Sequence, residues 1–117
     1  MKRLLCAGAV TCLLLLSQLG NGHADGAYDG EWNGSATVAR GRCKPAVVTL
    51  TVLGKIVTGQ ARFELGAQDI RGTVSADGAL GATVGFQHLT GKFDLDSFEG
   101  TINSLDCAWK ITLKRTK

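Results

Sequence analysis

The sequence predicts an all-β protein: a small antiparallel up-and-down β-barrel of about eight strands, closed by one disulfide. Three observations lead to this fold class. Apolar and polar residues alternate with period two along most of the chain after residue 25, as they do in strands with one buried face. Glycines recur on the apolar face of these segments, and two cysteines stand next to the first and the last of them.

The N-terminal segment has the residue order of a secretory signal. Met1-Lys2-Arg3 precede an apolar run from Leu4 to Leu19, and small residues follow up to Ala24. The run is shorter than the ~20 residues of a membrane-spanning helix, and no second run follows it. We therefore expect residues 1–24 to be a signal peptide and residues 25–117 to form a single β-barrel domain. The processed protein is then periplasmic or secreted and has no membrane span.

The charge balance changes when the signal is removed. The net charge of +3 includes Lys2 and Arg3, and the remaining chain carries 11 basic and 10 acidic side chains. This near-neutral balance gives no reason to expect nucleic acid as a partner. The remaining 93 residues are enough for one domain but near the size at which core burial becomes marginal.

Eight segments show the strand pattern. They are Tyr28–Val38, Val47–Leu53, Ile56–Glu64, Asp69–Ser75, Ala79–Gln87, Leu89–Asp94, Phe98–Asn103 and Cys107–Arg115. The alternation places most apolar side chains on the inner face, among them Phe63, Phe86 and Leu95. Asp77-Gly78 is a strong signal for a hairpin turn, and no segment after the signal has a helical period.

Glycines on the inner face predict strong curvature. Gly34, Gly59, Gly72, Gly91 and Gly100 fall on apolar faces, although glycine is a poor strand residue. Such glycines let strands coil and leave room for the two tryptophans and four phenylalanines. We expect these aromatic side chains to fill the interior. A flat sandwich, or a barrel with a ligand cavity, is the alternative.

The two cysteines favour closure of the sheet. Cys43 follows the first strand and Cys107 begins the last, and in an up-and-down meander both lie at the same end. In an oxidising compartment we expect a Cys43–Cys107 disulfide that clips the first strand to the last; two buried free thiols are the alternative. Closure would also remove the two exposed sheet edges.

Few residues have catalytic or metal-binding potential. His88, the only histidine after residue 24, is expected in the link between the fifth and sixth strands, and one histidine without a free thiol cannot form a typical zinc site. Asp94, Asp96 and Glu99 surround one turn but lack the spacing of an EF-hand loop. We therefore expect no catalytic residue, no metal and no cofactor, and we interpret these side chains as solvated turn residues.

The basic loop between the first and second strands is the strongest candidate for binding. Arg40, Arg42 and Lys44 lie within five residues, around Cys43. Three cations on a tethered loop can steer an acidic partner, and other loops of the same rim, with His88 at the periphery, would add contacts. The alternative is a solvated loop without a partner.

These observations predict a non-enzymatic binding module for an acidic protein surface. An exported barrel with one disulfide is similar in architecture to the small periplasmic inhibitors of lysozyme or metalloproteases. An inhibitor of a secreted or periplasmic hydrolase is therefore the specific form of the hypothesis. A carrier that holds a small ligand inside the barrel is the alternative, and a weak hydrolase that uses His88 is a third.

Overall fold

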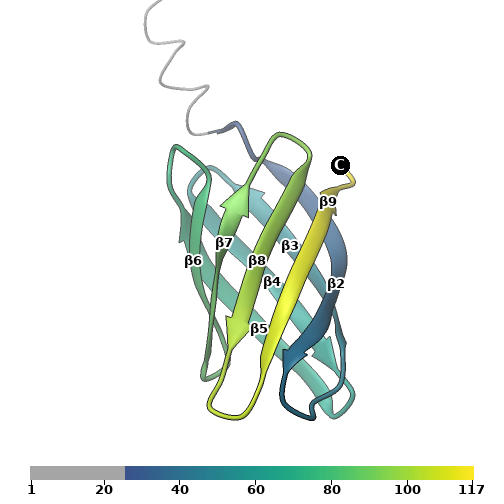
Figure 1. Ribbon diagram of the computed structural model, residues 1–117. Helices are drawn as coiled ribbons and strands as arrows, with labels where there is room; N and C mark the ends of the chain where they lie inside the picture. The colour runs from purple at the N-terminus through teal and green to yellow at the C-terminus, as the bar shows by residue number, and fades with distance from the viewer. Residues whose placement is uncertain (1–25) are drawn as a thin grey trace, which may run out of the picture.

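Residues 26–117, described by a computed structural model, form one closed antiparallel barrel (Figure 1). Its strands follow the order of the chain around the barrel. They are β2 (Gly30–Arg40), β3 (Ala46–Leu53), β4 (Ile56–Phe63), β5 (Gly66–Val74), β6 (Ala79–Val84), β7 (Gln87–Phe93), β8 (Ser97–Asn103) and β9 (Ala108–Arg115). The predicted fold class is confirmed, and the strand bounds differ from the predicted ones by up to three residues. The expected signal peptide, residues 1–24, lies outside the described residues.

Closure is made by the pairing of β2 with β9. In this seam Trp32 lies opposite Arg115, Val38 lies opposite Trp109, and the register shifts between Val38 and Arg40. Each remaining pair joins strands that are neighbours in the chain. Among residues 26–117, no helix is long and apolar enough to cross a membrane.

The barrel has two ends with different connections. We name the end with connections 41–45, 64–65, 85–86 and 104–107 the disulfide rim; it lies at the bottom of Figure 1. The opposite end, the terminal rim, has the turns 54–55, 75–78 and 94–96 and the segments 26–29 and 116–117. Both rims are therefore built mostly from short hairpin connections, and the longest of them is the basic loop.

Inward-facing side chains pack the interior with hydrocarbon and aromatic groups. No polar or charged residue between residues 26 and 117 is buried. The buried residues are Trp32, Ala36, Ala46, Val48, Leu50, Val52, Val57, Ala61, Ile70, Val74, Leu80, Val84, Leu89, Phe93, Phe98, Ile102, Cys107, Trp109, Ile111 and Leu113. Removal of this apolar surface from water is the main contribution to stability, as in other barrels whose interior is filled by side chains.

The inner-face glycines make room for aromatic rings. A Cβ atom on Gly100 would lie 2.8 Å from Cζ and 2.9 Å from Cε2 of Phe98, and a Cβ atom on Gly91 would overlap the same ring. Because Phe98 is fully buried, it has no space to move away. The interpretation of these glycines as packing positions is confirmed at this pair.

A tryptophan closes each end of the barrel. At the terminal rim, Trp32 donates its indole N–H to the carbonyl of Tyr28 at 3.0 Å, and the guanidinium of Arg115 stacks on the Trp32 ring at 4.7 Å. At the disulfide rim, Trp109 packs edge-to-face against Phe63 with ring centroids 5.3 Å apart. The two indoles come from opposite ends of the β2–β9 seam, so the seam strands also plug the barrel.

Three side chains lie elsewhere than the alternation predicts. Gly85 and Phe86 form the two-residue turn between β6 and β7, with φ of 61° at Gly85, and Phe86 is fully exposed instead of buried. Leu95 is 71% exposed in the turn between β7 and β8. His88 lies within β7 and not in a link, because the turn comes two residues earlier than expected.

The Cys43–Cys107 disulfide is confirmed. It joins the connection after β2 to the residue that precedes β9, and the two Cα atoms are 6.2 Å apart. The bond therefore lies beside the seam and links the same two parts of the chain that the seam pairs. A disulfide is compatible with an oxidising compartment outside the cytoplasm.

Candidate functional site

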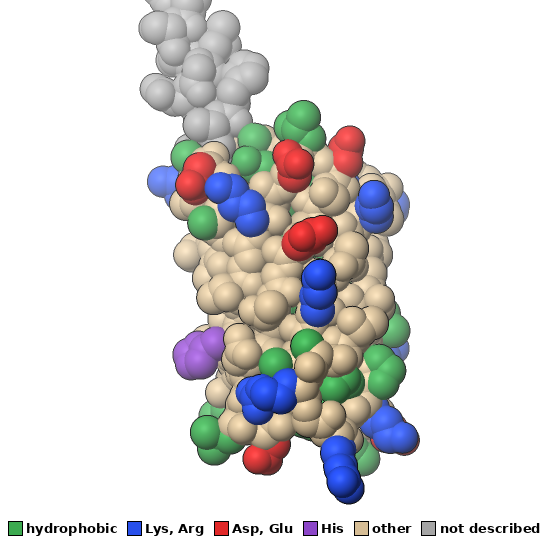
Figure 2. Space-filling view, in the orientation of Figure 1, with side chains coloured by type: hydrophobic (Ala, Val, Ile, Leu, Met, Phe, Trp, Pro, Cys, Tyr) green, Lys and Arg blue, Asp and Glu red, His purple; other side chains and the backbone are tan. Residues whose placement is uncertain are grey.

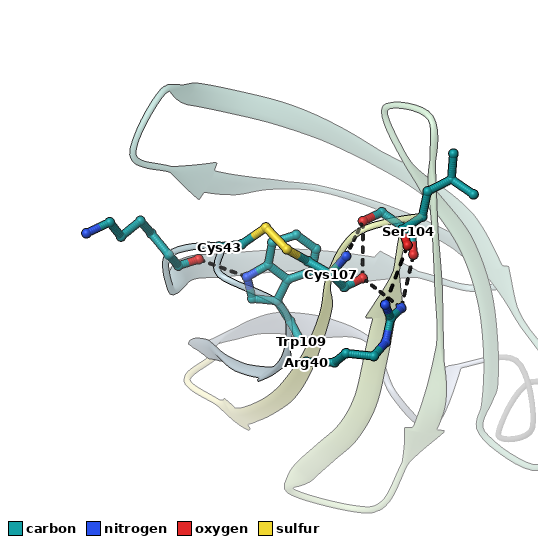
Figure 3. Close-up of a disulfide and its surroundings, with 7 residues drawn as sticks. Arg40, Cys43, Ser104, Cys107 and Trp109 are labelled. Carbon is teal, nitrogen blue, oxygen red and sulfur yellow. Dashed lines mark hydrogen bonds between the residues drawn. A yellow bond between two sulfur atoms is a disulfide. The ribbon is translucent and has the colours of Figure 1, made fainter.

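The basic loop, residues 41–45, is held at two successive residues. Cys43 is bonded to Cys107, and the carbonyl of Lys44 accepts a hydrogen bond of 2.8 Å from the indole of Trp109 (Figure 3). Gly41 has a φ of 93°, and a Cβ atom there would lie 2.7 Å from Sγ of Cys107. The loop therefore has a defined shape, while the side chains of Arg42 and Lys44 are exposed.

Arg40 has a different role from its two basic neighbours. Its guanidinium donates to the carbonyls of Ser104 at 3.1 Å, Cys107 at 3.4 Å and Leu105 at 3.5 Å (Figure 3). These bonds join the end of β2 to the connection between β8 and β9. Arg40 therefore positions that connection, and Arg42 and Lys44 are the cations of this group that point to solvent without such bonds.

An apolar pocket of about 230 Å³ opens next to the disulfide. It is lined by Cys43, Lys44, Phe63, Glu64, Leu65 and Trp109. A second hollow of about 280 Å³ lies on the other side of the β4–β5 turn, where Phe63, Leu65 and Gln87 are among its lining residues. The Oε1 atom of Gln87 is buried and has no hydrogen-bond partner within the chain described here. The β4–β5 turn thus stands between two hollows.

Three connections of the disulfide rim carry a hydrophobic residue at the tip. Leu65 is 99% exposed, Phe86 is fully exposed and Leu105 is 96% exposed. Exposed hydrophobic side chains also occur at the terminal rim, where Leu53, Ile56 and Leu95 are between 56% and 73% exposed. Figure 2 shows the hydrophobic side chains toward the two ends and mainly other residue types over the middle of the wall. The tips of the disulfide rim differ from those of the terminal rim in their nearly complete exposure.

Charges of both signs surround these tips. Arg42 and Lys44 extend from the basic loop, Glu64 precedes Leu65, and Asp106 follows Leu105, all of them exposed. Between residues 26 and 117, the one ion pair within 4 Å is Lys92–Asp77 on the terminal rim. Arg42, Lys44, Glu64 and Asp106 therefore form no ion pair within 4 Å in this part of the chain.

His88 does not join the basic loop. Its side chain is exposed on the outer wall of β7, where the residue pairs with Thr83 of β6 and Asn103 of β8. Two strands, β8 and β9, lie between β7 and the seam strand β2 that leads into the loop. The structure therefore brings together Arg42, Lys44 and the disulfide, turns Arg40 to the neighbouring connection, and leaves His88 apart.

The acidic turn at residues 94–99 offers no metal-ligand cluster. Across residues 26–117, no group of three or more histidine, cysteine, aspartate or glutamate side chains is placed to hold a metal ion. Nearby on the terminal rim, hydrogen bonds from the Ser75 hydroxyl and the Ala79 backbone, together with the charge of Lys92, hold the pKa of Asp77 below its ordinary value. These contacts stabilise the hairpin.

The sequence reasoning missed the apolar part of this rim. Leu65, Phe86 and Leu105 stand in turns beside glycine or charged residues, and this position was the available signal that they face solvent. The pocket had no signal in the sequence, since Phe63 and Trp109 come from strands far apart in the chain. No protein-family model, no curated protein and no solved structure matches the chain.

Proposed function

We propose that the protein is a non-enzymatic binding module, exported from the cytoplasm, that binds another protein through its disulfide rim. The observation that carries this proposal is the set of three fully projecting apolar side chains on the same rim as the tethered basic loop. Apolar anchors surrounded by charged residues are the usual anatomy of a protein interface.

The dimensions of the hollows support a protein partner over the carrier alternative. Pockets for small ligands are typically about 300–1,000 Å³ and enclose most of the ligand. A hollow of about 500 Å³ at the terminal rim reaches this size, but the exposed, charged side chains of Lys92, Asp94 and Glu99 form most of its lining. The two hollows of the disulfide rim, of about 230 and 280 Å³, are smaller, and the barrel interior is occupied by its own side chains. Hollows of this size suit single side chains presented by another protein.

The fixed loops support an inhibitor of a secreted or periplasmic hydrolase as the specific form of the proposal. The disulfide, the Trp109 hydrogen bond and the three bonds of Arg40 hold two rim connections in place before binding. Order that exists before binding reduces the entropy lost on association. Arg42 and Lys44 would attract an acidic surface and raise the association rate at low salt.

The test is affinity capture from the secreted fraction with three immobilised forms of the protein. The wild type is compared with a disulfide-rim variant and a matched terminal-rim variant. The two variants are Leu65→Ser/Phe86→Ser/Leu105→Ser and Leu53→Ser/Ile56→Ser/Leu95→Ser. We expect one captured protein that the first variant loses and the second retains, since truncated anchors each lower binding by about 2 kcal/mol or more.

Charge reversal separates steering from anchoring. Reversal of Arg42 and Lys44 should slow association at low salt and leave the circular dichroism spectrum unchanged, whereas Arg40 is excluded because it positions a loop. A partner that both rim variants retain would place the binding surface on the barrel wall and contradict the proposal. Substrate turnover that His88→Ala abolishes would establish the hydrolase alternative instead.

A further inference from the structure

We infer that the disulfide rim also binds a second copy of this chain, so that two barrels pair end to end with Leu65 of each copy in the pocket beside Trp109 of the other. This inference rests on the proposed function in one respect, namely that the disulfide rim is the binding surface. It adds that a second copy of the chain covers this surface when the partner protein is absent.

An exposed leucine and an apolar pocket lie side by side on the disulfide rim. Leu65 is 99% exposed, and the pocket of about 230 Å³ opens next to it toward Cys43 and Trp109. A two-fold interface requires one surface that complements itself, because residue i meets residue j and residue j meets residue i. An apolar side chain next to an apolar hollow of similar size satisfies this requirement.

The pocket and the charges together select one two-fold axis. The basic loop and the β4–β5 turn are neighbours on the rim, because β3 pairs with β4. An axis perpendicular to the barrel and between these two connections places the basic loop of one copy on the β4–β5 turn of the other. Lys44 then meets Glu64 twice across the interface. An axis through the basic loop would instead oppose Arg42 and Lys44 to themselves. An axis between the basic loop and the β8–β9 connection would pair these cations with Asp106, but it would set Leu65 on the β6–β7 turn of the other copy, away from the pocket.

The same axis also pairs the two remaining connections. The turn that carries Phe86 faces the β8–β9 connection, which carries Leu105, of the other copy. All three apolar tips are then covered. Because the end of an eight-stranded barrel is small, the interface belongs to the class below about 1,200 Å², which is typical of weak and transient association. A membrane surface fits less well, because Glu64 and Asp106 directly adjoin two of the tips and offset the attraction of Arg42 and Lys44 to anionic lipid.

Sedimentation velocity of the oxidised, processed protein from about 1 to 500 µM tests the inference, with a dimer expected to form in the micromolar range. Leu65→Asp should keep the protein monomeric throughout, and Leu95→Asp, at an exposed leucine of the opposite rim, should not. K44E and E64K should each weaken self-association at least tenfold, because each opposes like charges. An equimolar mixture of K44E and E64K should recover the dimer, since one is then acidic and the other basic at both positions.

Three results of the sedimentation experiments would overturn the inference. They are a wild type that stays monomeric at all these concentrations, a dimer that L65D leaves unchanged, and a mixture of the charge variants that fails to associate. Binding to phosphatidylglycerol vesicles that L65D abolishes would also overturn it and assign the tips to a lipid surface. Capture of a secreted partner by a monomeric wild type would refute the dimer alone, whereas a dimer without any captured partner would leave the dimer and remove the proposed function.

Discussion

Loss of the disulfide should lower the free energy of unfolding by about 2–4 kcal/mol. The sequence separation of Cys43 and Cys107 is 64, so the bond closes a loop of more than half of the domain. The chain-entropy relation gives about 4 kcal/mol for a loop of this length at room temperature. Residual structure in the unfolded chain reduces this value, which sets the lower end of the range. For a domain of this size, total stability is about 5–14 kcal/mol, so the loss is a large share.

The assay is urea unfolding of Cys43→Ala/Cys107→Ala, followed by circular dichroism, beside the reduced wild type. Cys107 is 1% exposed, so the alanine variant also loses buried contacts, and the reduced wild type isolates the effect of the bond. We expect both forms to unfold at a lower urea concentration than the oxidised wild type. The free energy of unfolding of the alanine variant should be lower than that of the reduced wild type by about 1 kcal/mol. A change below about 1 kcal/mol in the reduced wild type would show that loop entropy does not govern this domain. Alkylation of both cysteines without reductant would refute the bond itself.

Three other perturbations have defined outcomes. Trp109→Phe removes the hydrogen bond to the Lys44 carbonyl and should cost about 1 kcal/mol in urea unfolding, with faster hydrogen exchange in the basic loop. Gly91→Val should cost about 3 kcal/mol, because the added atoms overlap the buried Phe98; an unchanged midpoint would contradict this packing. Asp77→Asn should destabilise the protein at neutral pH, since the folded-state pKa of Asp77 lies below its ordinary value of 3.8. The difference should begin to shrink near pH 3.8 and disappear once the pH falls below the folded-state pKa, and urea midpoints at several pH values check this.

The closed barrel could be predicted because its signals are local and agree with one another. Period-two alternation identifies strands, and the glycines that face Phe98 indicate strong curvature. The Cys43–Cys107 bond agrees with this topology. With an even number of antiparallel strands, the end of the first strand and the start of the last lie at the same end of the barrel, and closure makes these two strands neighbours. No long-range contact had to be known in advance.

The position of a turn is harder to predict than the existence of a strand. Alternation continues through Gly85 and Phe86, and only the pairing of Val84 with Gln87 shows that the chain reverses there. One displaced turn moved Phe86 from the core to the surface and His88 from a loop into β7. The cross-strand register decides such cases, and it depends on the whole sheet.

Only part of the candidate site could be predicted, because the rest depends on contacts between strands that are distant in the sequence. Cations beside Cys43 are visible in the sequence, but charge alone does not say where a long side chain points. Arg40 bends toward the carbonyls of the β8–β9 connection because the seam brings that connection within its reach. The pocket arises from the meeting of Phe63 with Trp109, 46 positions further along the chain. Tertiary structure alone creates it.

Closure through β2 and β9 also makes the barrel sensitive to incomplete synthesis. A chain that stops before Cys107 leaves β2 and β8 with unpaired backbone groups, and it lacks both Cys107 and the Trp109 plug. Such a fragment would expose two open edges and a free thiol at once, which favours aggregation and proteolysis. In the expected export route, the barrel can therefore close only after β9 has crossed the membrane, and only chains that include Cys107 can form the disulfide.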